Sequence, residues 1–338
     1  TVVCFVLGAG VGTFVLWGSP RPIAGDGSVS LPAAFTAAAI AAASFVISTL
    51  LHRRGEHAAM PGWQVIISSV SAVALTIAFA AVTALGVLLA SEVLGVGLQG
   101  LELPALGGGI VTGVASAVAG RLAFDAGIGL TTSDLATLLF SYLVIGTLFA
   151  MLTAADPRWW EVNFSQLGIG VHGWAFNGTL VVAGILIVTV GMYLGRDLHR
   201  IRGDGSLGRI ATVVVLWAAT GAALAGVGIF PIAQNIVVHN IAAVSTLVLF
   251  VAASVVTTAV MPGPPRPLLI TTVAVALMLV AAFVLADTFK LYSLTVLEAI
   301  VIGLGLLWLT TLVRILAVLT PQSPRPSVRG ALPRPATR

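Results

Sequence analysis

Apolar residues follow one another along this chain in long continuous runs, without the alternation of apolar and polar positions that a membrane β-barrel needs. A transmembrane helix takes about 20 apolar residues. On that criterion the pattern predicts ten spans, at residues 1–17, 32–52, 63–91, 105–124, 132–154, 172–195, 208–229, 236–261, 267–286 and 294–318. We therefore expect an all-α fold, a polytopic integral membrane protein with about ten transmembrane helices.

Three of these spans have features of their own. The first begins at Thr1 inside an apolar run, so we expect further residues before it and interpret the run as a retained span. The third is long and should tilt or extend past the bilayer. The fourth is rich in glycine and is the weakest prediction of an uninterrupted helix. Pairs of small residues at a spacing of four indicate close helix packing: Gly8 with Gly12, Gly109 with Gly113, Gly191 with Gly195, and Gly221 with Ala225.

Composition supports the same fold class. Hydrophobic residues make up 58% of the 338 residues and charged residues 8%, whereas soluble domains carry about 25% charged residues. In a soluble protein the net charge of +4 would suggest a nucleic-acid partner, but here membrane orientation explains it and we expect no nucleic acid. The single cysteine, Cys4, excludes an intramolecular disulfide and a cysteine-based metal site. No cofactor and no metal site is predicted.

The basic residues predict the orientation. With both termini in the cytoplasm, the outer segments hold only Arg21, Arg158 and Lys290. The cytoplasmic segments then hold thirteen arginines: residues 53, 54, 121, 196, 200, 202, 209, 266, 314, 325, 329, 334 and 338. Thirteen against three is a strong positive-inside bias.

Polar residues concentrate in two islands, at residues 156–178 and 228–240, and both lie on the extracytoplasmic side in this orientation. The chemistry therefore belongs to the last six spans. We predict a four-helix membrane bundle over 1–130, a six-span core over 131–319, and a disordered cytoplasmic tail over 320–338, which is rich in proline and arginine. The first four spans are the expected surface for a second copy or another membrane protein.

Glu298 and His239 are the sharpest candidates for catalysis. A lone carboxylate in the last span must be protonated, pair with another helix or face a polar cavity, unless it reaches outward to water. Helical spacing places Asn235 and His239 on one face, and a histidine there could act as a general base or simply hydrogen-bond a neighbouring helix. Asp156 is the third candidate, as an acid or orienting group.

The remaining candidates are amides and a hydroxyl suited to binding a ligand: Asn163, Ser165, Gln166, Asn177, Asn235 and Asn240. Structural interpretations stand beside that one. Asn163 and the Ser165-Gln166 pair fit the start of a short outer helix. Asn177 fits a hydrogen bond between helices.

The motifs FSQLG, FN, GIFP and HN, with a tryptophan in the final span, resemble the bacterial membrane proteins grouped as domain of unknown function 998 (DUF998), over roughly residues 132–318. The matching positions are Ser165, Leu167, Gly168, Phe176, Asn177, Gly184, Gly228, Phe230, Pro231, His239, Asn240 and Trp308. The resemblance implies a six-span core with an outward-facing polar pocket in a bacterial cytoplasmic membrane. It also implies lipid-related work, because the family is remotely similar to eukaryotic proteins of lipid-anchor remodelling and autophagy-linked membranes, but it implies no reaction.

Three hypotheses follow. The first is a protein whose outer polar pocket binds a membrane lipid or a lipid-linked envelope precursor. The second is an intramembrane hydrolase or acyltransferase that uses His239 with Glu298 or Asp156. The third is a transporter or a structural subunit of a membrane complex, which ranks last because the two halves show no inverted repeat.

Overall fold

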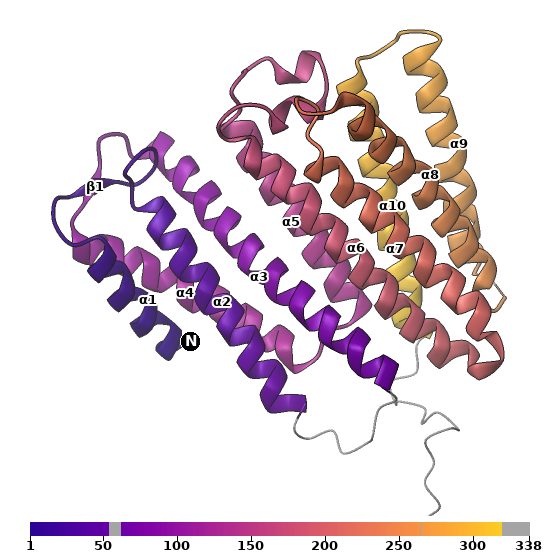
Figure 1. Cartoon of the computed structure of the whole chain (residues 1–338), viewed down its shortest axis with the longest axis horizontal. Coiled ribbons are helices and arrows are strands. Elements are labelled where there is room, and N and C mark those ends of the chain that lie inside the picture. The colour runs from indigo at the N-terminus through magenta and orange to yellow at the C-terminus, as the bar shows by residue number, and fades with distance from the viewer. Residues whose placement is uncertain (54–61, 264, 320–338) are drawn as a thin grey trace, which may run out of the picture.

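The structure is a computed structural model that describes residues 1–53, 62–263 and 265–319. The predicted tail at 320–338, together with Arg54, lies outside the described residues. The chain forms two groups of helices that stand side by side (Figure 1). Short segments connect most of the helices, as expected for a multi-pass membrane protein.

The first group contains α1 (Val2–Val15), α2 (Ser30–Arg53), α3 (Gly62–Gly97) and α4 (Ala105–Ile128). Two short strands, β1 (Arg21–Pro22) and β2 (Glu102–Leu103), pair antiparallel and join the α1–α2 connection to the α3–α4 connection.

The second group contains α5 to α10 and three short 3-10 helices. The long helices are α5 (Thr132–Leu152), α6 (Gly173–Arg202), α7 (Leu207–Ile229), α8 (Ile236–Val260), α9 (Arg266–Asp287) and α10 (Leu294–Leu319). The 3-10 helices are η1 (Trp159–Glu161), η2 (Phe164–Gly168) and η3 (Asp204–Ser206). Successive helices run in opposite directions, so the connections at 153–172, 230–235 and 288–293 lie at the same end as the β1–β2 pair (Figure 1).

These elements confirm the predicted fold class. In the described part of the chain, nine helices are long and apolar enough to cross a membrane. The exception is α1, whose 14 residues reach about 21 Å at about 1.5 Å per residue, short of the bilayer's apolar thickness of about 30 Å. The long third run forms a 36-residue helix, and the glycine-rich fourth run is an uninterrupted helix.

Close backbone packing explains why α4 stays helical despite its glycines. A Cβ atom added at Gly8 or Gly12 of α1 would overlap Ser116 or Thr112 of α4, and one added at Gly113 would overlap Ala9 of α1. Small residues thus let the two helices approach, as expected in lipid.

The second group uses the same device between α6 and α7. A Cβ at Gly184 would overlap the carbonyl oxygen of Gly221, and a Cβ at Gly221 would overlap that of Gly184. Deeper in this group, Trp217 stacks on Trp308 with ring centroids 5.8 Å apart. The indole N–H of Trp308 donates to Thr272 at 2.8 Å, so α7, α9 and α10 are joined at one buried point.

The two groups share one hydrophobic core. A single cluster of buried residues extends from Ala34 on α2 to Leu316 on α10. Helix α3 connects the groups because it packs against α2 on one side and against α5 and α6 on the other.

Candidate functional site

The connection between α5 and α6 folds into a short turn that carries the motif FSQLG. This turn is η2, residues 164–168, and we call it the strap. It begins at Phe164 because Asn163, in an extended conformation, accepts the backbone N–H of Gln166 with its side-chain oxygen at 3.2 Å. The predicted start of a short helix at Asn163 is therefore confirmed.

Three side chains from three different helices hold the strap. Glu298 of α10 accepts the backbone N–H of Phe164 at 2.7 Å. His239 of α8 lies 2.8 Å from the hydroxyl of Ser165 through Nε2. Asn177 of α6 donates to the carbonyl oxygen of Gly168 at 3.0 Å, so the strap is fixed at its start, in its middle and at its end.

The hydrogen bonds around His239 define its tautomer. Nδ1 lies 2.9 Å from the carbonyl oxygen of Phe230 and 3.2 Å from that of Val227. Carbonyl oxygens only accept, so Nδ1 carries the proton, and in the neutral ring Nε2 is then an acceptor. The hydroxyl of Ser165 therefore donates to Nε2, and the imidazole, only 3% exposed, has both nitrogens engaged.

Glycines make room for these contacts. A Cβ at Gly168 would overlap the side-chain amide of Asn177, and a Cβ at Gly228 would overlap the carbonyl oxygen of Asn177. Three residues of the FSQLG, FN and GIFP motifs thus meet at one place, where the strap, α6 and α7 join.

The structure disagrees with the prediction that Asn235 and His239 share a helix face. Helix α8 begins at Ile236, and Asn235 is its N-cap with an extended backbone. The side chain of Asn235 accepts the N–H of Val238 at 3.1 Å and is exposed, whereas His239 is buried. The spacing argument fails because Asn235 lies one residue outside the helix.

The other predicted residues lie apart from this contact network. Asn240 is exposed and Gln166 is half-buried. Asp156 accepts the backbone N–H of Arg158 at 2.8 Å in an exposed turn. Within the described residues no hydrogen bond joins His239 to Glu298 or Asp156. His239 and Glu298 instead reach neighbouring residues of the strap.

One further contact to this region had no signal in the sequence. Thr295 of α10 donates its hydroxyl to the carbonyl oxygen of Trp160 at 2.8 Å. A threonine one turn before Glu298 in an apolar span resembles any helical threonine that bonds its own backbone, so only the tertiary arrangement identifies it.

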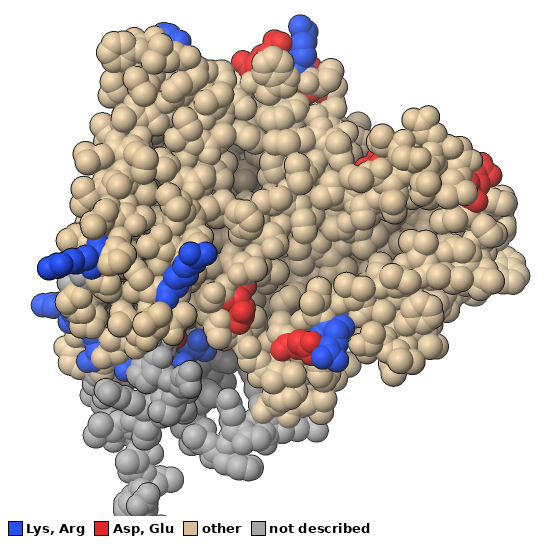
Figure 2. Space-filling model, turned by 180° about the vertical axis from the view of Figure 1, so that it is seen from behind, with Lys and Arg blue, Asp and Glu red and all other residues tan. Residues whose placement is uncertain are grey.

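A large groove opens elsewhere, between α3, α4 and α5. Its volume is about 850 Å³, and none of the sequence-predicted site residues lines it. Most of the wall is apolar, with Phe79, Val82, Leu122 and Ile145 among its residues. Figure 2 shows a hollow in the largely uncharged rear face, between the two groups of helices.

Polar groups gather at one end of the groove. Asp125 and Asp134 line it there, with Thr137 and Ser141 further along α5. Asp125 pairs with Arg121 at 2.6 Å. This end is opposite to the strap, because α4 ends and α5 begins there.

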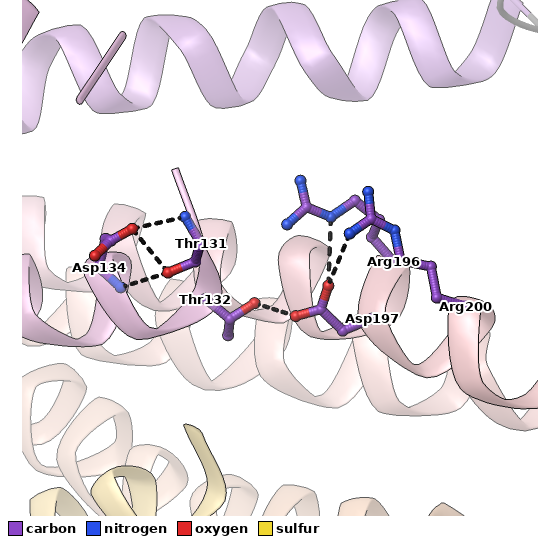
Figure 3. Close-up of polar contacts among 6 residues, drawn as sticks. All are labelled: Thr131, Thr132, Asp134, Arg196, Asp197 and Arg200. Atoms are coloured by element: carbon purple, nitrogen blue, oxygen red, sulfur yellow. Dashed lines mark hydrogen bonds and ion pairs between the residues drawn. The ribbon is translucent and has the colours of Figure 1, made fainter. Parts of the chain in front are cut away.

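Near the same end a buried carboxylate ties α5 to α6 (Figure 3). Asp197 is 5% exposed and accepts a hydrogen bond from the hydroxyl of Thr132. Arg196 and Arg200 lie 3.5 Å and 3.9 Å from its other oxygen. These contacts fix the start of α5 and explain why an acidic residue is present among arginines at the end of α6.

Comparison with known protein families gives a match over the second group of helices. The family model described as protein of unknown function (DUF998) matches residues 135–315. The match covers α5 to α10 almost completely and leaves α1 to α4 outside it, as the resemblance predicted. No curated protein and no solved structure matches the chain.

Proposed function

Because the chain belongs to the DUF998 family of proteins of unknown function, we propose its function from its own geometry: it binds a membrane lipid in the groove between α3, α4 and α5. The groove is the observation that supports this proposal. Its volume of about 850 Å³ lies within the range of roughly 300–1,000 Å³ that is typical of small-molecule sites.

The chemistry of the walls favours a lipid over a polar solute. The groove lies between helices that are long and apolar enough to span the bilayer, so acyl chains are its natural neighbours. Apolar side chains along most of its length suit those chains. The carboxylates of Asp125 and Asp134, together with the hydroxyls of Thr137 and Ser141, provide polar partners for a head group at one end.

The location differs from the outward-facing pocket that the sequence predicts. If the arginine-rich end of the helices is cytoplasmic, as the charge distribution indicates, the polar end of the groove lies in the cytoplasmic half of the membrane. The side chains at the other end, around the strap, are largely engaged in hydrogen bonds with one another and with the backbone.

A side chain added inside the groove tests the proposal. A Cβ at Gly86 would have no other atom within 4 Å, so Gly86→Trp directs a large ring into the groove without overlapping the protein near its Cβ. The matched control is Gly303→Trp, at an exposed position of α10 where a Cβ also meets nothing within 4 Å.

The measurement is native mass spectrometry of each full-length protein released from membranes in mild detergent. We expect wild type and Gly303→Trp to retain a bound lipid of the same mass, and Gly86→Trp to retain it at several-fold lower occupancy. Equal retention of lipid by all three proteins, or retention by none, would overturn the proposal.

A further inference from the structure

Ser165 and His239 have the geometry of an activated nucleophile and its base. The hydroxyl of Ser165 donates to Nε2 of His239 at 2.8 Å, and Nδ1 donates to the carbonyl oxygens of Phe230 and Val227. A nucleophile, a base within hydrogen-bond reach and a third group that orients the base form the arrangement that supports covalent catalysis. Here two backbone carbonyls take the orienting role that a carboxylate often has.

We propose that Ser165 is a catalytic nucleophile, that His239 is its general base, and that the pair transfers acyl groups from esters of membrane lipids. This activity lies outside the groove and does not depend on lipid binding there. It also assigns to Ser165 a reactive role that the position of the motif FSQLG alone does not imply.

The surroundings of the strap favour a lipid ester as the substrate. Trp160 and Trp174 flank the strap along the chain and are 55% and 51% exposed. Exposed tryptophans gather at the boundary between head groups and acyl chains, and the ester bonds of glycerolipids lie at the same boundary. Ser165 is half-buried, whereas His239 is buried, so the nucleophile is closer to the surface than its base.

The reaction balances without a redox partner. Oγ of Ser165 attacks the ester carbonyl carbon while its proton passes to Nε2 of His239. The carbon–oxygen bond to the alcohol then breaks, the alcohol leaves with that proton, and the acyl group remains on Ser165. Water, or the hydroxyl of a second molecule, attacks the acyl group and gives its proton to Nε2. The acid or new ester departs, and the proton returns to Oγ.

The backbone carbonyls hold the base in place throughout the reaction. When Nε2 takes the proton, the imidazole becomes a cation with two N–H groups. The oxygens of Phe230 and Val227 can accept from Nδ1 in both protonation states, so the ring keeps its orientation while Nε2 takes up the proton and gives it back. A hydrogen bond that only holds α8 against the strap would not make Ser165 reactive. The experiment therefore measures the reactivity of Ser165.

The first experiment treats the full-length protein in nanodiscs with a fluorophosphonate probe, whose phosphorus accepts an activated serine oxygen and loses fluoride. We expect a single adduct on Ser165, absent in Ser165→Ala and retained in Ser293→Ala, an exposed serine at the same end of the molecule. In His239→Gln the rate of labelling should fall by roughly 100-fold, the scale of general-base catalysis. Thermal unfolding of each variant confirms that it is folded.

The assignment of Ser165 and His239 would be overturned if the folded wild type formed no adduct on Ser165. It would also be overturned if the rate of labelling were unchanged in folded His239→Gln. If His239→Gln does not fold, Ser165→Cys replaces it, in a background with Cys4→Ser. Iodoacetamide should alkylate the cysteine at 165 faster than one introduced by Ser293→Cys, and an equal or slower rate would also overturn the proposal.

The substrate class has a separate measurement. The wild type, without the probe, is incubated with vesicles of phosphatidylethanolamine and phosphatidylglycerol. The lysophospholipid that leaves in the first step is measured and compared with that from Ser165→Ala. Release by the wild type alone supports the ester substrate. An adduct on Ser165 without formation of lysophospholipid would leave the assignment of Ser165 as the nucleophile intact and refute glycerolipid esters as its substrate.

Discussion

The bond between Thr132 and Asp197 offers a quantitative test of how α5 is held. Thr132→Val removes the hydroxyl that donates to Asp197 and keeps the shape of the side chain. A hydrogen bond to a charged group contributes about 1.5–3 kcal/mol and a bond between neutral groups about 0.5–1.5 kcal/mol. Arg196 and Arg200 are 40% and 33% exposed, so solvent weakens their share of the interaction, and the hydroxyl should carry much of the local stability.

We therefore expect Thr132→Val to lower the free energy of unfolding by about 1.5–3 kcal/mol in the wild-type background. In the Asp197→Asn background, an amide oxygen can still accept from Thr132 but carries no charge, so the same change should cost about 0.5–1.5 kcal/mol. The two bonds differ by about 1 kcal/mol, which a double-mutant cycle resolves for residues in contact.

The assay is reversible unfolding in mixed micelles, followed by tryptophan fluorescence. The control is Thr310→Val, since Thr310 is exposed and donates only to Leu306 in its own helix. The reasoning is refuted if Thr132→Val costs no more than Thr310→Val, or if its cost is the same with and without Asp197→Asn.

Three further predictions concern packing, the strap and orientation. Gly221→Ala should destabilise the protein by about 1–3 kcal/mol in the same assay, because the new Cβ overlaps α6, whereas Gly303→Ala should not. Asn163→Ala removes the cap of the strap, so stability should fall by about 0.5–2 kcal/mol, with faster amide hydrogen exchange over 164–168; unchanged exchange there contradicts the role of the cap. In whole cells an impermeant maleimide should label a protein with Ser293→Cys but not one with Ser206→Cys, with the native cysteine replaced by serine; the reverse pattern would contradict the predicted orientation.

The sequence predicts the helices and their packing residues because these depend on local rules. Run length determines the spans, and the spacing of Gly8 and Gly12 indicates a surface for close packing, which the structure places against α4. The short helix after Asn163 can also be predicted from the sequence, since an asparagine cap acts within three residues.

The arrangement of the site depends on distances that the sequence does not contain. Phe164 and Glu298 are 134 residues apart, and Ser165 and His239 are 74 residues apart, so their pairing follows only from the docking of whole helices. Asn235 lies one residue before α8 and is extended, so helical spacing does not place it on the face of His239. The groove was not predictable at all, because it is space between helices that no residue pattern marks.

The anchors of the strap also set an order in time. The strap follows α5 in synthesis, but its partners arrive later: Asn177 with α6, His239 with α8, and Glu298 with the last helix, α10. Because synthesis proceeds from the N-terminus, the strap emerges from the ribosome before any helix that holds it. The strap therefore reaches its final position only after the last helix has entered the membrane. A chain truncated before residue 294 would leave the N–H of Phe164 without its bond to Glu298.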